Sequence, residues 1–365
     1  MRRGLLALAA AATLLLADAP QAWPATPRVP SGFFGATWDG SAALSSEEEQ
    51  ERQFALMARS GVDSVRVVFS WAEMEPAPLA FDFDRPDRLV ALAARHGVGL
   101  LPVILHPPDW AEEWTGAEGT PPRDPEEYAR LLRELVRRYG PSGSFWPLHP
   151  ELPRRPLREW QIWNEPHLDG YWNERGDPWP PGYTALLAAA HRAIKQEDGG
   201  ARVVLAALAD FSWRHLARIY RNGGRGLFDV AAINLYTSRP ELVVRGLRHF
   251  RRTMNRRGDA RRPVYLTEVG WPASLGRIPR PAARWQRAWE TTDRGMARRV
   301  TRFFGLAAAR RRGLGLRRVY WYNWASSYRP GSIFNFMGLT RFDGQSIQAK
   351  PALRAFRASV RRYGR

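Results

Sequence analysis

Two glutamates, Glu165 and Glu268, are the residues of this sequence best placed to do chemistry. Each follows a short apolar run with strand character, residues 160–163 and 264–266. A carboxylate at the end of a strand lies at a sheet edge, where it faces ligand rather than core. Pro166 disfavours helical geometry at Glu165, so we expect the extended conformation to persist through this residue. The two carboxylates can meet only in a fold that gathers strand ends on one face, as a parallel barrel does.

Eight apolar segments, each followed by a helical pattern, predict such a barrel. Most of the strands are near-continuous apolar runs, typical of strands covered on both faces. A doubly wound open sheet is the alternative, but the count of eight and the lack of a glycine-rich turn after the first strand favour the barrel. The fold class is therefore α/β, a (β/α)8 TIM barrel forming one domain over residues 26–365. The strands are expected near 32–38, 62–69, 98–105, 160–165, 202–208, 228–236, 264–268 and 317–324, and the helices near 46–60, 86–96, 125–139, 181–197, 212–222, 240–257, 294–312 and 349–363.

Residues at or near the expected strand ends should line one open face of the barrel. They include carboxylates, an arginine, an amide, a phenol and several indoles, a mixture suited to a neutral polyhydroxylated ligand. Indole rings cover the apolar faces of sugars, and the polar groups satisfy the hydroxyls. The chain has 16 tryptophans, many of them near strand ends. The candidate site residues are Trp38, Arg66, Trp71, His106, Asn164, Glu165, Tyr236, Glu268, Trp271 and Trp324.

Two glutamates at a sugar site predict acid–base and nucleophilic work on a glycosidic bond. A separation of about 5–5.5 Å would indicate a retaining enzyme, and roughly 6.5–9.5 Å an inverting one. Arg66 beside Glu268 would keep that carboxylate ionised, and its charge would raise the pKa of Glu165 so that Glu165 can donate a proton. The alternative is a pair of rim glutamates in salt bridges with an arginine-rich chain. The position of both at strand ends with tryptophan nearby favours catalysis.

The stretches Gln161-Ile162-Trp163-Asn164-Glu165-Pro166 and Leu266-Thr267-Glu268-Val269-Gly270-Trp271 resemble the fourth- and seventh-strand signatures of clan A retaining glycoside hydrolases. Within that clan the chain is most similar to family 39 and the related family 5. Arg66, residues 71–76 with Phe81-Asp82-Phe83, Tyr236 and Trp324 also match. The resemblance covers nearly everything after the N-terminal segment.

The resemblance implies a role for each matching residue. Glu165 would be the acid/base, Glu268 the nucleophile, and Asn164 would hydrogen-bond the 2-hydroxyl of the sugar being cleaved. Arg66 and Tyr236 would position Glu268. Trp324 would form the floor of the subsite. For Trp38, Trp71 and Trp271, the expectation of sugar binding rests on their position near strand ends. His106 either binds substrate or caps a loop.

The composition bounds the remaining possibilities. The chain has no cysteine, and its histidines show no metal-ligand spacing, so we expect neither a metal nor a cofactor. The net charge is +19 and almost all of the cations are arginines, many in doublets. These either form solvated helix faces or attract an acidic glycan or an anionic cell surface. Nucleic acid is not an expected partner, because no recognisable binding module is present.

The N-terminus predicts export. Arg2 and Arg3 precede an apolar run, residues 4–17, and small residues and proline follow, so residues 1–25 are interpreted as a signal peptide. The run is shorter than the roughly 20 residues that span a bilayer; an uncleaved anchor is the alternative. We expect a monomeric protein that is secreted or associated with the cell surface, with no stable membrane span after cleavage.

These observations predict an exported retaining glycoside hydrolase that cleaves β-glycosidic bonds in a neutral or acidic oligo- or polysaccharide by double displacement. The alternatives are a catalytically silent glycan-binding barrel at the cell surface, and a transglycosylase, which would share the covalent intermediate. Two long loops, residues 107–125 and 271–292, are expected to wall the cleft.

Overall fold

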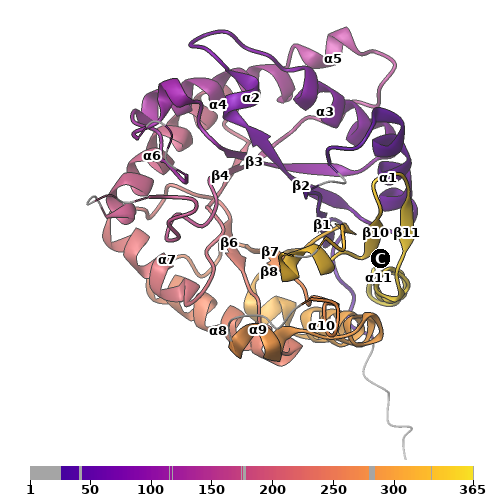
Figure 1. Cartoon of the computed structure of the whole chain (residues 1–365). Helices are drawn as coiled ribbons and strands as arrows, with labels where there is room; N and C mark the ends of the chain where they lie inside the picture. The colour runs from indigo at the N-terminus through magenta and orange to yellow at the C-terminus, as the bar shows by residue number, and fades with distance from the viewer. Residues whose placement is uncertain are drawn as a thin grey trace, which may run out of the picture.

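Eight parallel strands form the centre of the molecule, in the neighbour order β5-β4-β3-β2-β1-β8-β7-β6. Isolated bridges between Val204 and Val230 and between Leu208 and Ile233 connect the two outer strands, β5 and β6, and so bring the sheet round into a barrel. Figure 1 views this barrel end-on. The strands are β1 (Phe34–Thr37), β2 (Ser64–Ser70), β3 (Gly99–Leu105), β4 (Glu159–Ile162), β5 (Arg202–Val204), β6 (Ala231–Asn234), β7 (Val264–Val269) and β8 (Leu316–Trp321).

The coordinates are a computed structural model, which describes residues 26–40, 43–114, 116, 118–173, 175, 178–278, 284–329 and 331–364. The expected signal peptide, residues 1–25, lies outside this part of the chain. Within the described ranges, no helix combines the length and apolar character that a membrane crossing requires.

The main helices form an outer ring around the strands (Figure 1). They are α1 (Glu47–Arg59), α3 (Asp84–His96), α4 (Pro125–Tyr139), α6 (Trp179–Glu197), α7 (Ser212–Arg221), α8 (Pro240–Arg256), α10 (Asp293–Leu314) and α11 (Pro351–Tyr363). The predicted (β/α)8 barrel is thus confirmed. Short helices α2 (Trp71–Met74), α5 (Phe145–Leu148) and α9 (Arg284–Trp289), two 3-10 turns (Asp109–Ala111 and Ile333–Phe336) and a small sheet of β9 (Ala325–Ser326), β10 (Thr340–Phe342) and β11 (Ile347–Ala349) were not predicted.

Local sequence explains where the helices begin and end. Helix α1 begins after Ser46, whose side chain accepts a hydrogen bond from the Glu49 amide, and three glutamates occupy its first turn. Asp124 caps α4 in the same way, with Pro125 at the first helical position. Helix α3 ends at Gly97, whose φ of 71° is left-handed and suits a residue without a Cβ.

Two apolar layers hold the barrel together. One lies between the strands and the helices, and it includes most of the buried side chains. The other fills the barrel interior and consists of Leu101, Val204, Ala207, Val230, Ala232, Tyr265 and Tyr320. Gly35 on β1 permits this filling, since a Cβ there would lie 2.5 Å from the Tyr320 ring. The interior is therefore packed below the level at which the candidate site opens.

The backbone at Glu165 differs from the prediction. Regular pairing of β4 ends at Ile162, Trp163 has a φ of 68°, and the ladder resumes only as an Asn164–Ala207 bridge. Glu165 itself has a φ of 40°, so the expectation that it keeps an extended conformation is wrong. Proline disfavours right-handed helical geometry at the preceding residue, and Glu165 avoids that geometry through a left-handed φ rather than the extended φ that local preference favours.

Candidate active site

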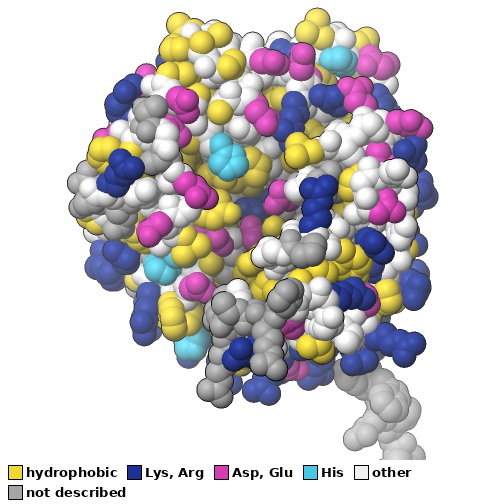
Figure 2. Space-filling model, in the orientation of Figure 1, with side chains coloured by type: hydrophobic (Ala, Val, Ile, Leu, Met, Phe, Trp, Pro, Cys, Tyr) yellow, Lys and Arg dark blue, Asp and Glu magenta, His cyan; other side chains and the backbone are white. Residues whose placement is uncertain are grey.

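A cavity of about 440 Å³ opens at the carboxyl ends of the strands. Figure 2 shows this face of the molecule, hollowed near its centre. The cavity is lined by residues from seven of the eight strands and the loops after them, which places it where barrel enzymes bind substrate. Its lining residues are Thr37, Trp38, Asp39, Arg66, Val67, Val68, Val103, Leu105, His106, Asn164, Glu165, Tyr171, Tyr236, Glu268, Tyr322 and Phe334.

Glu268, near the end of β7, is held by two donors. The Nη1 atom of Arg66 on β2 lies 2.7 Å from Glu268 Oε1, and the Tyr236 hydroxyl donates to Oε2. The residue is 8% exposed, so the ion pair is largely shielded from water. Burial and the nearby Glu268 raise the pKa of Tyr236 well above its usual value of 10.0, which keeps its hydroxyl a donor. Both oxygens of Glu268 are therefore fixed in place.

Arg66 also orders the fourth strand. Its Nε donates to Gln161 Oε1 over 2.8 Å, and its Nη2 donates to Asn164 Oδ1 over 2.8 Å. Gln161 in turn donates to the Trp163 carbonyl. One buried guanidinium thus fixes the nucleophile candidate and the amide beside Glu165. Because the Asn164 oxygen accepts from Arg66, the Asn164 amino group is left to donate to a ligand.

Glu165 has a different environment. Its Oε1 accepts a 2.7 Å hydrogen bond from the Nδ2 atom of Asn234, whose orientation is fixed by a hydrogen bond from Thr267 to its oxygen. The residue is 7% exposed. Burial, followed by the charge of Glu268, raises the pKa of Glu165 from its usual 4.5 to about 8, against smaller lowering effects of Asn234 and Arg66. Glu165 is therefore protonated at neutral pH.

Left-handed backbone conformations cluster around the cavity. His106 follows β3 with a φ of 58°, Trp163 and Glu165 follow β4, and Asp210 with a φ of 30° follows β5. Residues other than glycine rarely adopt this geometry, and His106 and Glu165 are the two described residues of the cavity lining, glycine apart, that have it. His106 lines the cavity and is solvent-exposed. Partial desolvation of its imidazole ring lowers the pKa of His106 below its usual value. The ring is therefore a neutral polar group near pH 7.

The predicted aromatic residues divide into two groups. Trp38 lines the cavity, with its Nε1 donating to Gln53 over 3.1 Å. Trp71, Trp271 and Trp324 are completely buried and are not among the residues that line it, so their contact with substrate stays a prediction. Trp71 donates to Glu75, and Trp271 donates to the carbonyl of Thr237. Hydrogen bonds thus anchor the buried indoles of Trp71 and Trp271 within the packed interior.

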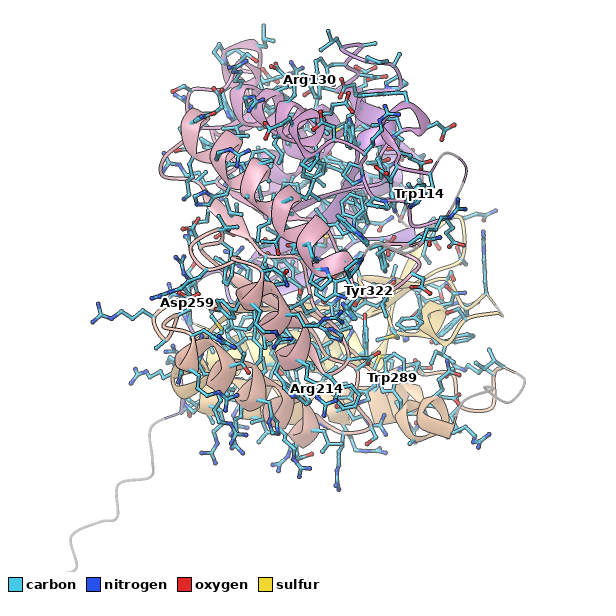
Figure 3. The ribbon with its side chains drawn as sticks, turned by 90° about the vertical axis from the view of Figure 1, so that its left-hand side faces the viewer. Trp114, Arg130, Arg214, Asp259, Trp289 and Tyr322 are labelled. Carbon is cyan, nitrogen blue, oxygen red and sulfur yellow. The ribbon has the colours of Figure 1, made fainter. Side chains whose placement is uncertain are left out.

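Aromatic residues other than Trp71, Trp271 and Trp324 line the cavity. Tyr171, Tyr322 and Phe334 line the cavity, and Asp39 accepts a hydrogen bond from the Tyr322 hydroxyl over 3.3 Å. In Figure 3, Tyr322 and Trp289 lie in the same part of the molecule. Trp289 packs on Tyr236 and Phe334 with ring centroids 5.0 and 5.4 Å apart.

The sequence contained weak signals for some of the missed residues. Asn234 lies two positions before Tyr236, and alternation along a strand places two such residues on one side. Tyr322 likewise lies two positions before Trp324, so the same alternation would place both side chains on one side. Among the described residues, neither of the long loops 107–125 and 271–292 lines the cavity, contrary to expectation. Also within the described chain, no group of three histidine, aspartate or glutamate residues could hold a metal ion.

Comparisons with known proteins lead to glycoside hydrolases. The sequence pattern of glycoside hydrolase family 42, described as β-galactosidase, matches residues 43–123, and no curated protein matches the chain. Among solved structures, a monomeric β-xylosidase from Caulobacter crescentus has a TM-score of 0.66 at 16% identity, covering 91% of this chain and 68% of that one. The chain is similar to clan A glycoside hydrolases.

Two further structures extend this similarity. A family 39 glycoside hydrolase from Bacteroides cellulosilyticus has a TM-score of 0.62 at 17% identity, over 92% of this chain and 65% of that one. A family 5 protein from Bifidobacterium longum, solved with Manβ1-4GlcNAc, has a TM-score of 0.63 at 17% identity, over 91% and 78%. This chain therefore spans about two thirds to four fifths of these proteins. At such identities the similarity establishes the shared barrel fold, and the chemistry must be argued from the site itself.

Proposed function

We propose that this protein is a retaining glycoside hydrolase that cleaves β-glycosidic bonds by double displacement. The observation that carries the proposal is the contrast between two buried glutamates in one cavity. Glu268 is paired with Arg66, whereas Glu165 has a pKa raised to about 8 by burial and by the charge of Glu268. One carboxylate can therefore attack while the other supplies a proton.

The first step begins with Glu268. Its ionised carboxylate attacks the anomeric carbon, and the bond between that carbon and the leaving oxygen breaks. Glu165 transfers its proton to the leaving oxygen; Asn234 holds Oε1, which leaves Oε2 to carry that proton. The Asn164 amino group donates to the 2-hydroxyl of the sugar, because the Asn164 oxygen is already used by Arg66.

The second step releases the sugar. Glu165, now ionised, takes a proton from water, and the oxygen of that water attacks the anomeric carbon and displaces Glu268. The nucleophile and the acid/base return to their starting protonation states. Two inversions at one carbon give a product with the anomeric configuration of the substrate.

The charges of the cavity favour a neutral sugar at the cleaved bond. Among its described lining residues, Asp39, Glu165 and Glu268 are acids, and Arg66 is the only arginine or lysine. The guanidinium of Arg66 donates to Gln161, Asn164 and Glu268, and its charge is paired with that of Glu268. A carboxylated sugar would meet no available cation there. We propose an exported, monomeric enzyme whose substrate is a β-linked oligo- or polysaccharide with a neutral unit at this position.

The test is hydrolysis of a panel of nitrophenyl β-glycosides, beginning with xyloside, glucoside, mannoside and galactoside, the sugars named for the similar proteins. The configuration of the first product is then read by proton NMR. The proposal predicts a β product that mutarotates slowly to the α form. An initial α product would contradict the retaining mechanism, and binding of the panel sugars without cleavage would favour the glycan-binding alternative.

A further inference from the structure

The end of the barrel opposite the cavity carries a concentration of exposed arginines. They come from the C-terminal ends of α8, α10 and α11, from the turns that follow, and from the segment before β1. We call this surface the basic end; its members are Arg28, Arg256, Arg257, Arg261, Arg310, Arg312, Arg317, Arg361 and Arg362, all of them exposed. We propose that the basic end binds the surface of an anionic phospholipid bilayer.

The positive charge of this surface is not neutralised locally. The segments that form it, residues 26–32, 251–262, 308–318 and 354–364, contain one acid, Asp259. Asp259 is 6% exposed and is occupied by the Tyr220 hydroxyl and by Arg262. Within the described chain, no member of the basic end forms an ion pair with an acid, whereas Arg52, Arg85 and Arg302 elsewhere do. The nine cations therefore face solvent as an excess of charge.

Buried contacts hold the parts of this surface together. Arg251, 5% exposed, donates to the carbonyls of Leu314, Ala260 and Arg262 over 2.9, 3.1 and 2.8 Å, which joins the ends of α8 and α10. Arg311 donates to the Arg28 carbonyl over 2.9 Å, and the Val29 amide donates to Tyr363 over 2.8 Å. Three helix ends and the first described segment thus present their arginines from one framework.

A hollow within the basic end has the chemistry of a site for a phosphate group. It encloses about 660 Å³, and its cationic walls are Arg28, Arg311, Arg312 and Arg317. Ala308 and Val29 supply apolar wall, and none of the lining residues is acidic. Guanidinium groups bind phosphate oxygens through paired hydrogen bonds. A headgroup phosphate could enter this hollow while the surrounding arginines meet neighbouring anionic lipids.

The position of the chain's N-terminal segment favours a bilayer over other polyanions. Thr26 borders this hollow, so residues 1–25, with their apolar run at 4–17, join the fold at the basic end. The eight residues between that run and Thr26 can extend at most about 30 Å. Retention of this segment in the membrane, the uncleaved-anchor alternative, would therefore keep the basic end, rather than the cavity, within reach of lipid headgroups.

Binding at the basic end would leave the cavity open. Figure 3 shows Asp259, which marks this end, on the side of the molecule opposite Tyr322 and Trp114. An acidic glycan bound by the same arginines would lie far from Glu165 and Glu268, whereas a bilayer there orients the cavity toward the surrounding glycan. Because the basic end is remote from the cavity, its binding to lipid can be tested independently of the proposed hydrolysis.

The experiment is sedimentation of the full chain with phosphatidylcholine vesicles, either pure or containing 30% phosphatidylglycerol. Three arginines of the basic end, Arg256, Arg310 and Arg312, are changed together to Gln. The matched control changes Arg239, Arg245 and Arg294 to Gln, because these exposed arginines lie at the other ends of the same two helices. Both triple variants lose the same charge.

The proposal predicts that the wild-type protein and the control variant bind the anionic vesicles more tightly than the neutral ones. It also predicts that 0.5 M NaCl removes this difference. The R256Q/R310Q/R312Q protein should lose about a hundredfold in partitioning to anionic vesicles, from roughly fivefold for each arginine near such a surface. Equal losses in both triple variants, or no preference for anionic lipid, would overturn the proposal. So would stronger binding to soluble polygalacturonate than to the vesicles. Circular dichroism verifies that each variant is folded.

Discussion

Each side of the cavity carries one glutamate, Glu165 after β4 and Glu268 on β7. The two are almost equally buried, yet their proposed roles are opposite. Glu165 is 7% exposed and Glu268 is 8% exposed. On the β7 side, a guanidinium and a phenol donate to both carboxylate oxygens. On the β4 side, one neutral amide donates to one oxygen. At nearly equal burial, the two glutamates thus differ in their partners, because Glu268 forms an ion pair with Arg66 whereas Glu165 contacts a neutral amide.

The two sides are nevertheless coupled. Arg66 contacts Glu268 directly and reaches Glu165 through Asn164, its neighbour in the sequence. The charge of Glu268 is in turn the second largest cause of the raised pKa of Glu165, after burial. A change on one side should therefore alter the other, and the following predictions are ordered from the largest expected effect to the smallest.

Glu268→Gln removes the nucleophile and should lower kcat on a nitrophenyl β-glycoside by roughly 10⁴-fold or more, because no covalent intermediate can form. The control is Glu241→Gln, which removes an exposed carboxylate paired with Arg302 and should leave kcat within about twofold of wild type. Steady-state kinetics measure both. Residual activity of the E268Q protein above 1% would refute the assignment.

Glu165→Ala removes the proton donor, and its effect should depend on the leaving group. With a poor leaving group, kcat/KM should fall by about 10²–10⁴-fold. With a dinitrophenyl glycoside the first step should be almost unchanged, since that leaving group departs without a proton. Azide should then restore turnover, because it attacks without a general base. Equal losses with both leaving groups would assign Glu165 a structural role.

Tyr236→Phe removes one of the two donors to Glu268 and keeps the ring that packs on Trp289 and Phe334. A hydrogen bond to a charged group contributes about 1.5–3 kcal/mol, so kcat/KM should fall by about 10–150-fold with little change in Tm. A wild-type kcat/KM in this variant would show that Arg66 alone positions the nucleophile.

Two substitutions should move the pH profile in opposite directions. Activity needs protonated Glu165, so kcat/KM should fall as pH rises through about 8. Asn234 stabilises the ionised carboxylate, so Asn234→Ala should raise the pKa of Glu165 and move the alkaline limb to higher pH. Asp210 disfavours ionisation, so Asp210→Asn should move that limb to lower pH, and by less, because Asp210 is exposed and screened by salt. Shifts in the same direction would contradict this electrostatic account.

Much of the barrel could be predicted because its signals are local. Apolar runs gave the strands, and Ser46, Asp124 and Gly97 mark helix boundaries through capping that depends on a few neighbouring residues. The expected pairing of Arg66 with Glu268 is present, since a long cation on β2 and a carboxylate near the end of β7 both face the interior of the barrel mouth, across β1 and β8.

The side-chain environment of the site could not be predicted in the same way. Whether an indole lines the cavity or lies beneath it depends on tertiary packing: Trp38 lines the cavity, whereas Trp271 lies beneath it and donates to the Thr237 carbonyl. Tyr322, and not Trp324, which was predicted to form the floor of the subsite, is among the residues after β8 that line the cavity. Asn234 contacts Glu165 only because closure of the barrel brings the end of β6 near the end of β4, with β5 between them.

The most direct test of the contrast between the two glutamates is trapping of the covalent intermediate. A 2-deoxy-2-fluoro glycoside of whichever sugar the enzyme hydrolyses slows the second step more than the first, so the glycosyl-enzyme accumulates. Peptide mapping by mass spectrometry then locates the sugar. The account predicts the label on Glu268, and a label on Glu165 would contradict it.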